Sequence, residues 1–365
     1  MPNFIPGLEL CGRYYAELVR PMLDGHFPNL RYAAALIGYG SEVLGFDTEM
    51  SMDHAWSPRL ILFLRENDLA LAGQIDELLK RELPTHFLGF PLGTRPSADE
   101  PGVFFMDEMS RVGQVEHKTL LTGLRDYVLE TMNWDLRQPL EPVDWLTIPS
   151  QVLCVMTAGR VYFDNLGELT KLRQQLAWYP HDLWLYLMAS VWDRIGQEEH
   201  LMPRAGFVGD ELGSALIGSR LVRDVMSLCY LMEKQYAPYP KWFGTAFQRL
   251  TCATAIAPLL WQAQQAPTWP ERQKALGAAF ELLARQHNAL GFTNPLPEKV
   301  SSFHGRPFLV IHAEVFAEAL KAKINDSEIL RIAEKGLLGG LDQFSDSTVL
   351  RSDLRWRPSL KALYK

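Results

Sequence analysis

Two short apolar runs near the N-terminus limit what this chain can fold into. Residues 33–37 read Ala-Ala-Ala-Leu-Ile, and residues 60–64 read Leu-Ile-Leu-Phe-Leu. Uninterrupted apolar runs of this length are typical of strands that are buried on both faces. The first run continues into Gly-Tyr-Gly-Ser, and Asp53 stands shortly before the second run. We therefore expect a buried sheet in which Gly40 and Ser41 follow one strand and Asp53 precedes the next.

The segment between these runs has the residue types that bind a phosphate. Gly40 lets backbone N–H groups approach an anion closely, and the hydroxyl of Ser41 adds a donor. An acidic side chain such as Asp53 can hold the Mg²⁺ that bridges phosphate oxygens, because Mg²⁺ takes carboxylates together with substrate phosphates. Asp47 and Glu49 lie in the same segment and are alternative ligands, although exposed loop acids need no such role.

This arrangement resembles the nucleotidyltransferase superfamily with the polymerase β-type fold, whose signature is Gly-Ser, a spacer and Asp-x-Asp. The matching positions here are Gly40, Ser41, Asp53 and Ala55, so the second acid is missing. The resemblance implies Mg²⁺-dependent transfer of a nucleoside monophosphate, with ATP as the expected donor, to a hydroxyl of a small molecule or a protein. The alternative is a catalytically inactive nucleotide-binding or interaction protein on the same scaffold, since Ala55 removes a metal ligand.

More closely, the chain resembles a bacterial group of uncharacterised nucleotidyltransferase-like proteins, the DUF4037 family. The resemblance covers most of residues 1–250. It rests on several segments, among them Gly-Ser-Glu-Val-Leu-Gly at 40–45, Trp-Tyr-Pro at 178–180, Gly-Asp-Glu-Leu-Gly at 209–213 and Lys-Trp-Phe-Gly at 241–244. The family is expected to have Asp-His-Asp-Trp where this chain has Asp53-His54-Ala55-Trp56.

A second acidic residue is a candidate for the same site. Two β-prone runs, 151–156 and 161–164, flank Thr-Ala-Gly-Arg, which is the form of a hairpin. The resemblance implies a further carboxylate on a later strand, and Asp164 at the end of the second run is the candidate. Asp53 and Asp164 are thus the expected catalytic residues and metal ligands. A turn or helix cap is the alternative role for Asp164.

Nucleotidyl transfer also needs positive charge, since the leaving pyrophosphate is an anion. Lys241 begins a predicted helix of the second domain and is the candidate for contacting the triphosphate. Arg220 and Arg223 on the preceding helix are alternatives. Each of the three can equally be a solvated surface charge, which is the usual state of Lys and Arg.

The order of patterns along the 365 residues predicts two domains. Strand and helix patterns alternate in the first part, including a helical pattern at 119–132, whereas the β signal nearly disappears after about residue 200. We expect an α+β protein with an N-terminal nucleotidyltransferase-like mixed β-sheet domain at 1–200. A C-terminal helical bundle at 201–365 follows, and the DUF4037-like region spans the junction.

Charge, cysteine spacing and apolar runs indicate which partners and which cell compartment to expect. A net charge of −7 without a basic cluster argues against nucleic acid as a partner. The four cysteines lie far apart, which favours free thiols in a reducing cytosol over disulfides or a zinc site. The N-terminus lacks the pattern of a signal peptide, and no apolar run reaches the length of a membrane span. We expect a cytoplasmic protein without a membrane partner, and the oligomeric state stays open.

Overall fold

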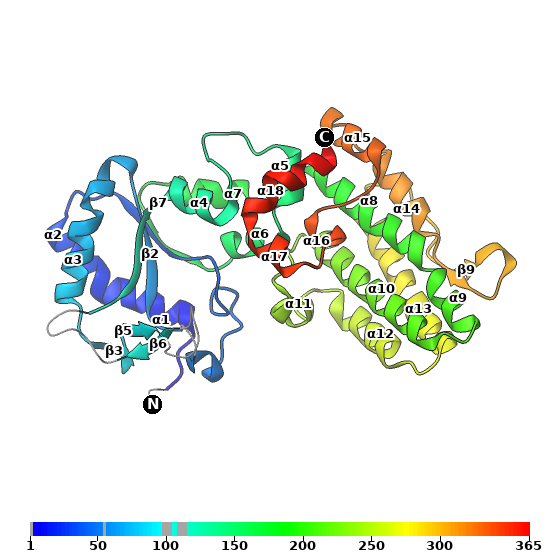
Figure 1. Cartoon of the computed structure of the whole chain (residues 1–365), viewed down its shortest axis with the longest axis horizontal. Coiled ribbons are helices and arrows are strands. Elements are labelled where there is room, and N and C mark those ends of the chain that lie inside the picture. Colours follow the sequence, from blue (N-terminus) through cyan, green and yellow to red (C-terminus); the bar gives the residue numbers. More distant parts are fainter. Residues whose placement is uncertain (1–2, 54–55, 97–103, 108–114) are drawn as a thin grey trace. The chain divides into compact units, whose positions relative to one another are not determined.

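A four-stranded mixed sheet lies at the centre of the N-terminal part of the computed structural model (Figure 1). The strands are β1 (Tyr32–Leu36), β2 (Arg59–Leu64), β7 (Lys118–Gly123) and β8 (Arg160–Asp164), in the spatial order β7-β2-β1-β8. β1 is antiparallel to β2 and β8, whereas β7 is parallel to β2. The two apolar runs form β1 and β2, and the predicted mixed sheet is confirmed.

The structure describes residues 3–53, 56–96, 104–107 and 115–365. The chain divides into two units. The sheet unit is Met1–Pro139 with Val152–Ala177, and the helical unit is Leu140–Gln151 with Trp178–Lys365. This division places Leu140–Gln151 and residues 178–200 in the helical unit, although both segments precede the predicted boundary at residue 200. The reason is that α8 (His181–Glu198) packs against α10 (Glu211–Met232) and α14 (Ala313–Lys321), which both belong to the helical unit.

The strand directions gather several strand ends at one edge of the sheet. β1 runs toward Gly40, and β8 starts at Arg160, which pairs with Leu36 at the end of β1. Arg59 begins β2 beside that end and pairs with Lys118, the first residue of β7. The end of β1 therefore meets the beginnings of β2, β7 and β8. We call this edge the Gly40 end of the sheet.

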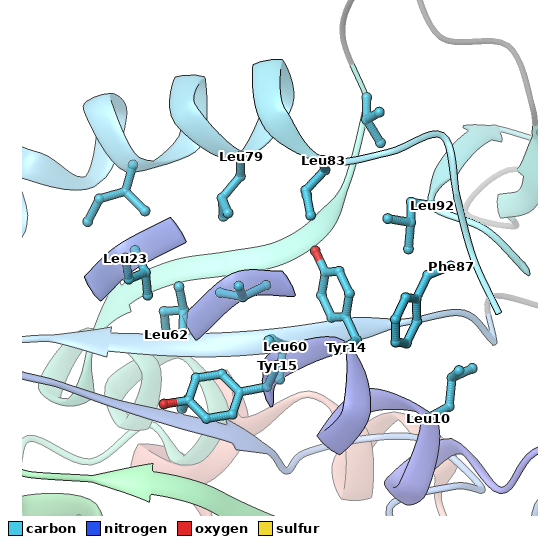
Figure 2. Close-up of a cluster of buried hydrophobic side chains, with 14 of the residues drawn as sticks. Leu10, Tyr14, Tyr15, Leu23, Leu60, Leu62, Leu79, Leu83, Phe87 and Leu92 are labelled. Carbon is cyan, nitrogen blue, oxygen red and sulfur yellow. The ribbon is translucent and has the colours of Figure 1, made fainter. Parts of the chain in front are cut away.

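Helices cover both faces of the sheet. Leu60 and Leu62 of β2 share one face, where they join Tyr14 in the core that Figure 2 shows. The helices on this face are α1 (Gly7–Tyr14), α2 (Arg20–His26) and α3 (Ala72–Glu82), and a π-helical turn at Tyr15–Val19 joins the first two. On the other face Phe63 packs edge-on against Tyr127 of α4 (Leu124–Met132). Burying one leucine side chain contributes about 1.5–3 kcal/mol.

Two local predictions are wrong. Residues Ser150–Thr157 form helix α6 and not the first strand of a hairpin, so only β8 remains of that prediction. A short apolar run fits a buried helix as well as a strand. Likewise, the predicted helix at 119–132 is strand β7 followed by α4. The remaining short elements of this unit are β3 (His86–Phe87), β4 (Phe90–Pro91), β5 (Gly93–Pro96), β6 (Phe104–Asp107) and α7 (Glu168–Gln175).

The helical unit is built mainly from long helices, as predicted for the C-terminal part. Besides α8, α10 and α14 it contains α5 (Pro142–Thr147), α9 (Leu201–Phe207), α11 (Pro240–Phe247), α12 (Ala253–Gln265), α13 (Trp269–Leu290), α15 (Ser327–Lys335), α16 (Leu341–Phe344), α17 (Thr348–Ser352) and α18 (Arg357–Leu360). Strands β9 (Ser301–Ser302) and β10 (Leu309–Val310) form a small hairpin. Residues 183–192 of α8 are all buried, so α8 forms the core of the unit.

Candidate functional site

The loop after β1 requires glycine at two positions. Gly38 and Gly40 have φ angles of +87° and +142°, a region that favours glycine. A Cβ atom at Gly40 would lie 2.6 Å from Oε1 of Glu42 and 2.7 Å from Nη2 of Arg59. The backbone of Gly40 therefore passes directly beside an ion pair, and no larger residue fits there without displacing it.

That ion pair places a positive charge next to the glycine loop. Nη2 of Arg59 donates to Oε1 of Glu42 at 2.7 Å and to the carbonyl oxygen of Tyr39 at 2.6 Å. Glu42 is buried, whereas the Arg59 side chain is 23% exposed. Arg59 is held by its position as the first residue of β2. Its guanidinium is thus fixed at the Gly40 end and remains partly accessible.

Lys118 adds a second cation at the same end. It begins β7 and pairs in parallel register with Arg59. Burial, together with the nearby charge of Arg59, lowers the pKa of Lys118 to about 8, although the carboxylate of Glu42 acts in the opposite direction. Lys118 therefore loses its proton more easily than an ordinary lysine. Arg59 and Lys118 were not predicted from the sequence, although the position of each at the start of a strand was a usable signal.

Asp53 lies on the chain segment that returns to the Gly40 end. Its backbone closes the 3-10 turn Glu49–Asp53, a few residues before Arg59 begins β2. Its side chain, like residues 54–55, lies outside the described part of the structure. The prediction that Asp53 is a metal ligand and catalytic residue, and the prediction that Ala55 weakens the site, therefore stay predictions.

Asp164 does not join this site. In the register of β8 with β1, Asp164 pairs with Ala33 and Arg160 pairs with Leu36. Three residues of a strand span roughly 10 Å, so Asp164 lies at the opposite end of the sheet from Gly40. Its Oδ1 accepts from the N–H of Gly167, and its Oδ2 accepts from the N–H and hydroxyl of Thr170. The predicted convergence of Asp164 with Gly40 is wrong, and Asp164 instead caps the turn into α7.

The acids of the loop have structural contacts. Oδ2 of Asp47 accepts from the N–H of Gly7 at 2.7 Å and from Nε1 of Trp56 at 3.1 Å, which ties the loop to the start of α1. Glu42 is paired with Arg59. Among the described residues, no three His, Cys, Asp or Glu side chains are grouped so that they could hold a metal ion. Asp164 is thus remote from the Gly40 end and Asp47 is engaged, and the Mg²⁺ centre that the resemblance implies stays a prediction because it depends on Asp53.

The predicted phosphate-binding lysine lies in the helical unit. Lys241 is in the first turn of α11, and its Nζ lies 4.9 Å from the ring centroid of Trp242. The alternatives are ion-paired on α10, Arg220 with Glu198 and Arg223 with Asp346. The contact of Lys241 with a triphosphate stays a prediction.

The fold defines an α+β protein with a mixed-sheet unit and a helical unit. Within it, residues 145–243 match the model of the family described as domain of unknown function, DUF4037. This match agrees with the part of the sequence resemblance that lies at 145–243, whereas residues 1–144, which include Gly40 and Ser41, lie outside it.

Among solved structures, a nucleotidyltransferase-like protein from Exiguobacterium sibiricum 255-15 aligns with 86% of this chain and 89% of its own. The two are 11% identical with a TM-score of 0.31, which is too low to support a shared fold or function. No curated protein matches the chain significantly. In the part of the chain that the structure describes, no helix has the length and apolar character needed to cross a membrane.

Proposed function

We propose that the sheet unit binds the triphosphate of a nucleotide, ATP in the first instance, at the Gly40 end of the sheet. The observation that supports this proposal is the grouping of a glycine-serine loop with two cations, Arg59 and Lys118, at one edge. Glycine backbone N–H groups, a serine hydroxyl and fixed cations are the groups that bind phosphate oxygens.

The donor atoms suit a polyphosphate better than a single carboxylate. Arg59 donates to Glu42 and Tyr39 through Nε and Nη2. Nη1 is therefore the nitrogen from which a phosphate oxygen would accept a hydrogen bond. Lys118 acts as a point charge that contacts a second oxygen. The partial burial of both cations strengthens their attraction for an anion relative to the same charges in bulk water.

For the chemistry, we propose slow or absent transfer of the nucleoside monophosphate to a hydroxyl acceptor. Ala55 replaces one acid of the signature, and Asp164 is held at the other end of the sheet by its bonds to Gly167 and Thr170. Of the carboxylates that the resemblance implies as metal ligands, only Asp53 is still a candidate at the Gly40 end of the sheet. This favours a nucleotide-binding protein on a nucleotidyltransferase-like scaffold over an efficient transferase, and any transfer step would be Mg²⁺-dependent.

A calorimetric titration with a non-hydrolysable ATP analogue and Mg²⁺ tests the binding site. We expect Lys118→Gln to weaken affinity about tenfold or more, as loss of a charge-assisted bond does. Ser41→Ala removes one hydroxyl donor and should weaken affinity by a similar factor. The matched control is Arg31→Gln, because Arg31 donates to the carbonyl of Asn165 at the opposite end of the same sheet.

The proposal predicts no change for Arg31→Gln. Equal losses for Arg31→Gln and Lys118→Gln would show that net charge and not a site attracts the nucleotide. Unchanged affinity in both Lys118→Gln and Ser41→Ala would remove the Gly40 end as the binding site.

A further inference from the structure

The helical unit contains a cavity of about 390 Å³. Leu187, Val191 and Arg194 line it from α8, and Arg223 and Ser227 line it from α10. The residues of each set are three or four positions apart, so each set comes from one face of its helix. The cavity therefore lies between two packed helices whose facing side chains do not fill the space.

Aromatic rings form much of the remaining wall. Trp145 and Tyr179 meet edge-on with ring centroids 5.7 Å apart, and Tyr179 meets Tyr236 at 5.1 Å. Tyr230 and Phe243 form a second pair at 5.2 Å. Folded interiors are otherwise close-packed, and ligand pockets of roughly 300–1,000 Å³ are typically lined by apolar and aromatic groups with a few polar ones. The size and lining of the cavity are those of a small-molecule site.

The cavity is built largely by the family region. Most of its lining residues fall within residues 145–243, the segment that matches DUF4037, and residues 340–351 contribute the others. All lining residues belong to the helical unit. An inference about this cavity is therefore independent of the proposed nucleotide site in the sheet unit.

Two of the three arginines at the cavity have firmly held partners. Arg194 is paired with Asp224, whose side chain is only 1% exposed. Arg351 is paired with Asp342 at 2.8 Å, and Asp342 also accepts from the N–H of Ser150 at 2.6 Å. These carboxylates are fixed by burial or by a second bond. An anionic ligand at Arg194 or Arg351 would therefore have to displace a carboxylate that is firmly held.

Arg223 differs, because its partner is readily exchanged. Asp346 is 75% exposed, and ion pairs between exposed side chains are weak. An anionic group in the cavity can replace Asp346 at Arg223, and the guanidinium fork suits a planar carboxylate. We propose that the cavity binds a small aromatic carboxylic acid, with the ring between the aromatic walls and the carboxylate at Arg223.

The test compares acids with neutral amides of the same shape. The full chain is titrated by calorimetry with benzoate, naphthalene-2-carboxylate and anthracene-2-carboxylate, and with the three corresponding carboxamides. We expect at least one acid to bind about tenfold more tightly than its amide, as a charge-assisted bond provides. Binding of none of the acids, or equal binding of each acid and its amide, would overturn the proposal.

Variants locate the binding. Arg223→Gln should reduce the affinity for the acid to that for the amide. The matched control is Arg220→Gln, since Arg220 is one turn away on α10, is ion-paired with Glu198 and does not line the cavity. Equal effects of the two substitutions would contradict the assignment of the carboxylate to Arg223.

Ser227→Phe places a ring inside the cavity from the face of α10 that lines it. We expect this variant to lose the acid and the amide alike while it keeps the affinity of the chain for the ATP analogue. Thermal unfolding checks that Ser227→Phe folds. If this variant does not fold, the comparison of Arg223→Gln with Arg220→Gln decides whether the acid binds in the cavity. Acid binding that survives Ser227→Phe in the folded protein would place the site elsewhere.

Discussion

At the residue scale, the proposed function depends on side chains whose roles follow from register more than from residue type. Arg59 and Lys118 are ordinary surface-type residues in the sequence, yet pairing of β2 with β7 sets them side by side next to Gly40. Asp164 is the opposite case, since its residue type suggested a metal ligand and its register places it at the far end of the sheet. Without the strand pairing, the sequence cannot show which of these residues lie at the Gly40 end of the sheet and which lie at the other end.

The lowered pKa of Lys118 predicts a pH dependence of nucleotide affinity. Lys118 binds an anion only when protonated, and burial lowers its pKa to about 8. We therefore expect affinity for the ATP analogue to fall as pH rises from 7.5 to 9.5, because the free protein loses this charge first. Calorimetry of Lys118→Arg, which stays charged throughout, should show a much flatter profile. Identical profiles for the two proteins would exclude Lys118 as the source.

The alanine at position 55 leads to a prediction about the rate of nucleotidyl transfer. Ala55 stands where the signature of the resembled superfamily has its second acid, so Ala55→Asp restores the carboxylate that is expected to act with Asp53. We expect this substitution to raise pyrophosphate release above that of the unmodified chain, measured with four nucleoside triphosphates and Mg²⁺. A fully active unmodified chain that gains nothing from the added acid would show that the Asp-x-Asp assignment is wrong.

At the scale of elements, the two apolar runs at 33–37 and 60–64 predicted β1 and β2 correctly, whereas the apolar run at 151–156 and the helical pattern at 119–132 did not predict the elements that form there. Residues Ser150–Thr157 form α6, and the contact that fixes its end comes from another element. Arg173 of α7 donates to the carbonyl oxygens of Met156, Thr157 and Ala158. Such a contact satisfies the terminal carbonyls of a helix and cannot be read from the local pattern.

Removal of this contact should destabilise the sheet unit. Arg173→Met keeps an apolar stem but leaves three carbonyl groups at the end of α6 without their donor, at a cost of about 2 kcal/mol. Urea unfolding measures the change. Lys171→Met is the control, since Lys171 is an exposed residue of the same helix and should change stability by less than about 0.5 kcal/mol. Equal stability of the two variants would show that the contact is dispensable.

At the scale of the whole molecule, the order of strand and helix patterns along the chain predicted a mixed-sheet part and a helical part, and the structure has both. The division between them is less simple than a cut at residue 200, because Leu140–Gln151 belongs to the helical unit although Val152–Ala177 returns to the sheet unit. Within the helical unit, buried Arg357 near the C-terminus pairs with Asp144 of α5 at 2.7 Å. An ion pair between residues so far apart in sequence leaves no signal in either segment.

This ion pair should stabilise the helical unit against unfolding. Lys361 also contacts Asp144, so Arg357→Met leaves that carboxylate with a single cationic partner. We expect a loss of about 3 kcal/mol, the lower end of the range for breaking a buried pair. Arg355→Met is the control, because Arg355 is 89% exposed in its pair with Asp353 and its loss should change stability much less. Similar unfolding midpoints in urea for both variants would contradict this account.

A crystal structure of the chain with Mg²⁺ and a non-hydrolysable ATP analogue would show whether the Gly40 end of the sheet binds a triphosphate. We expect phosphate oxygens within hydrogen-bonding distance of the Gly40–Ser41 backbone, with the side chains of Arg59 and Lys118 contacting them. A nucleotide bound elsewhere on the chain, with Arg59 and Lys118 making no contact to it, would contradict this expectation.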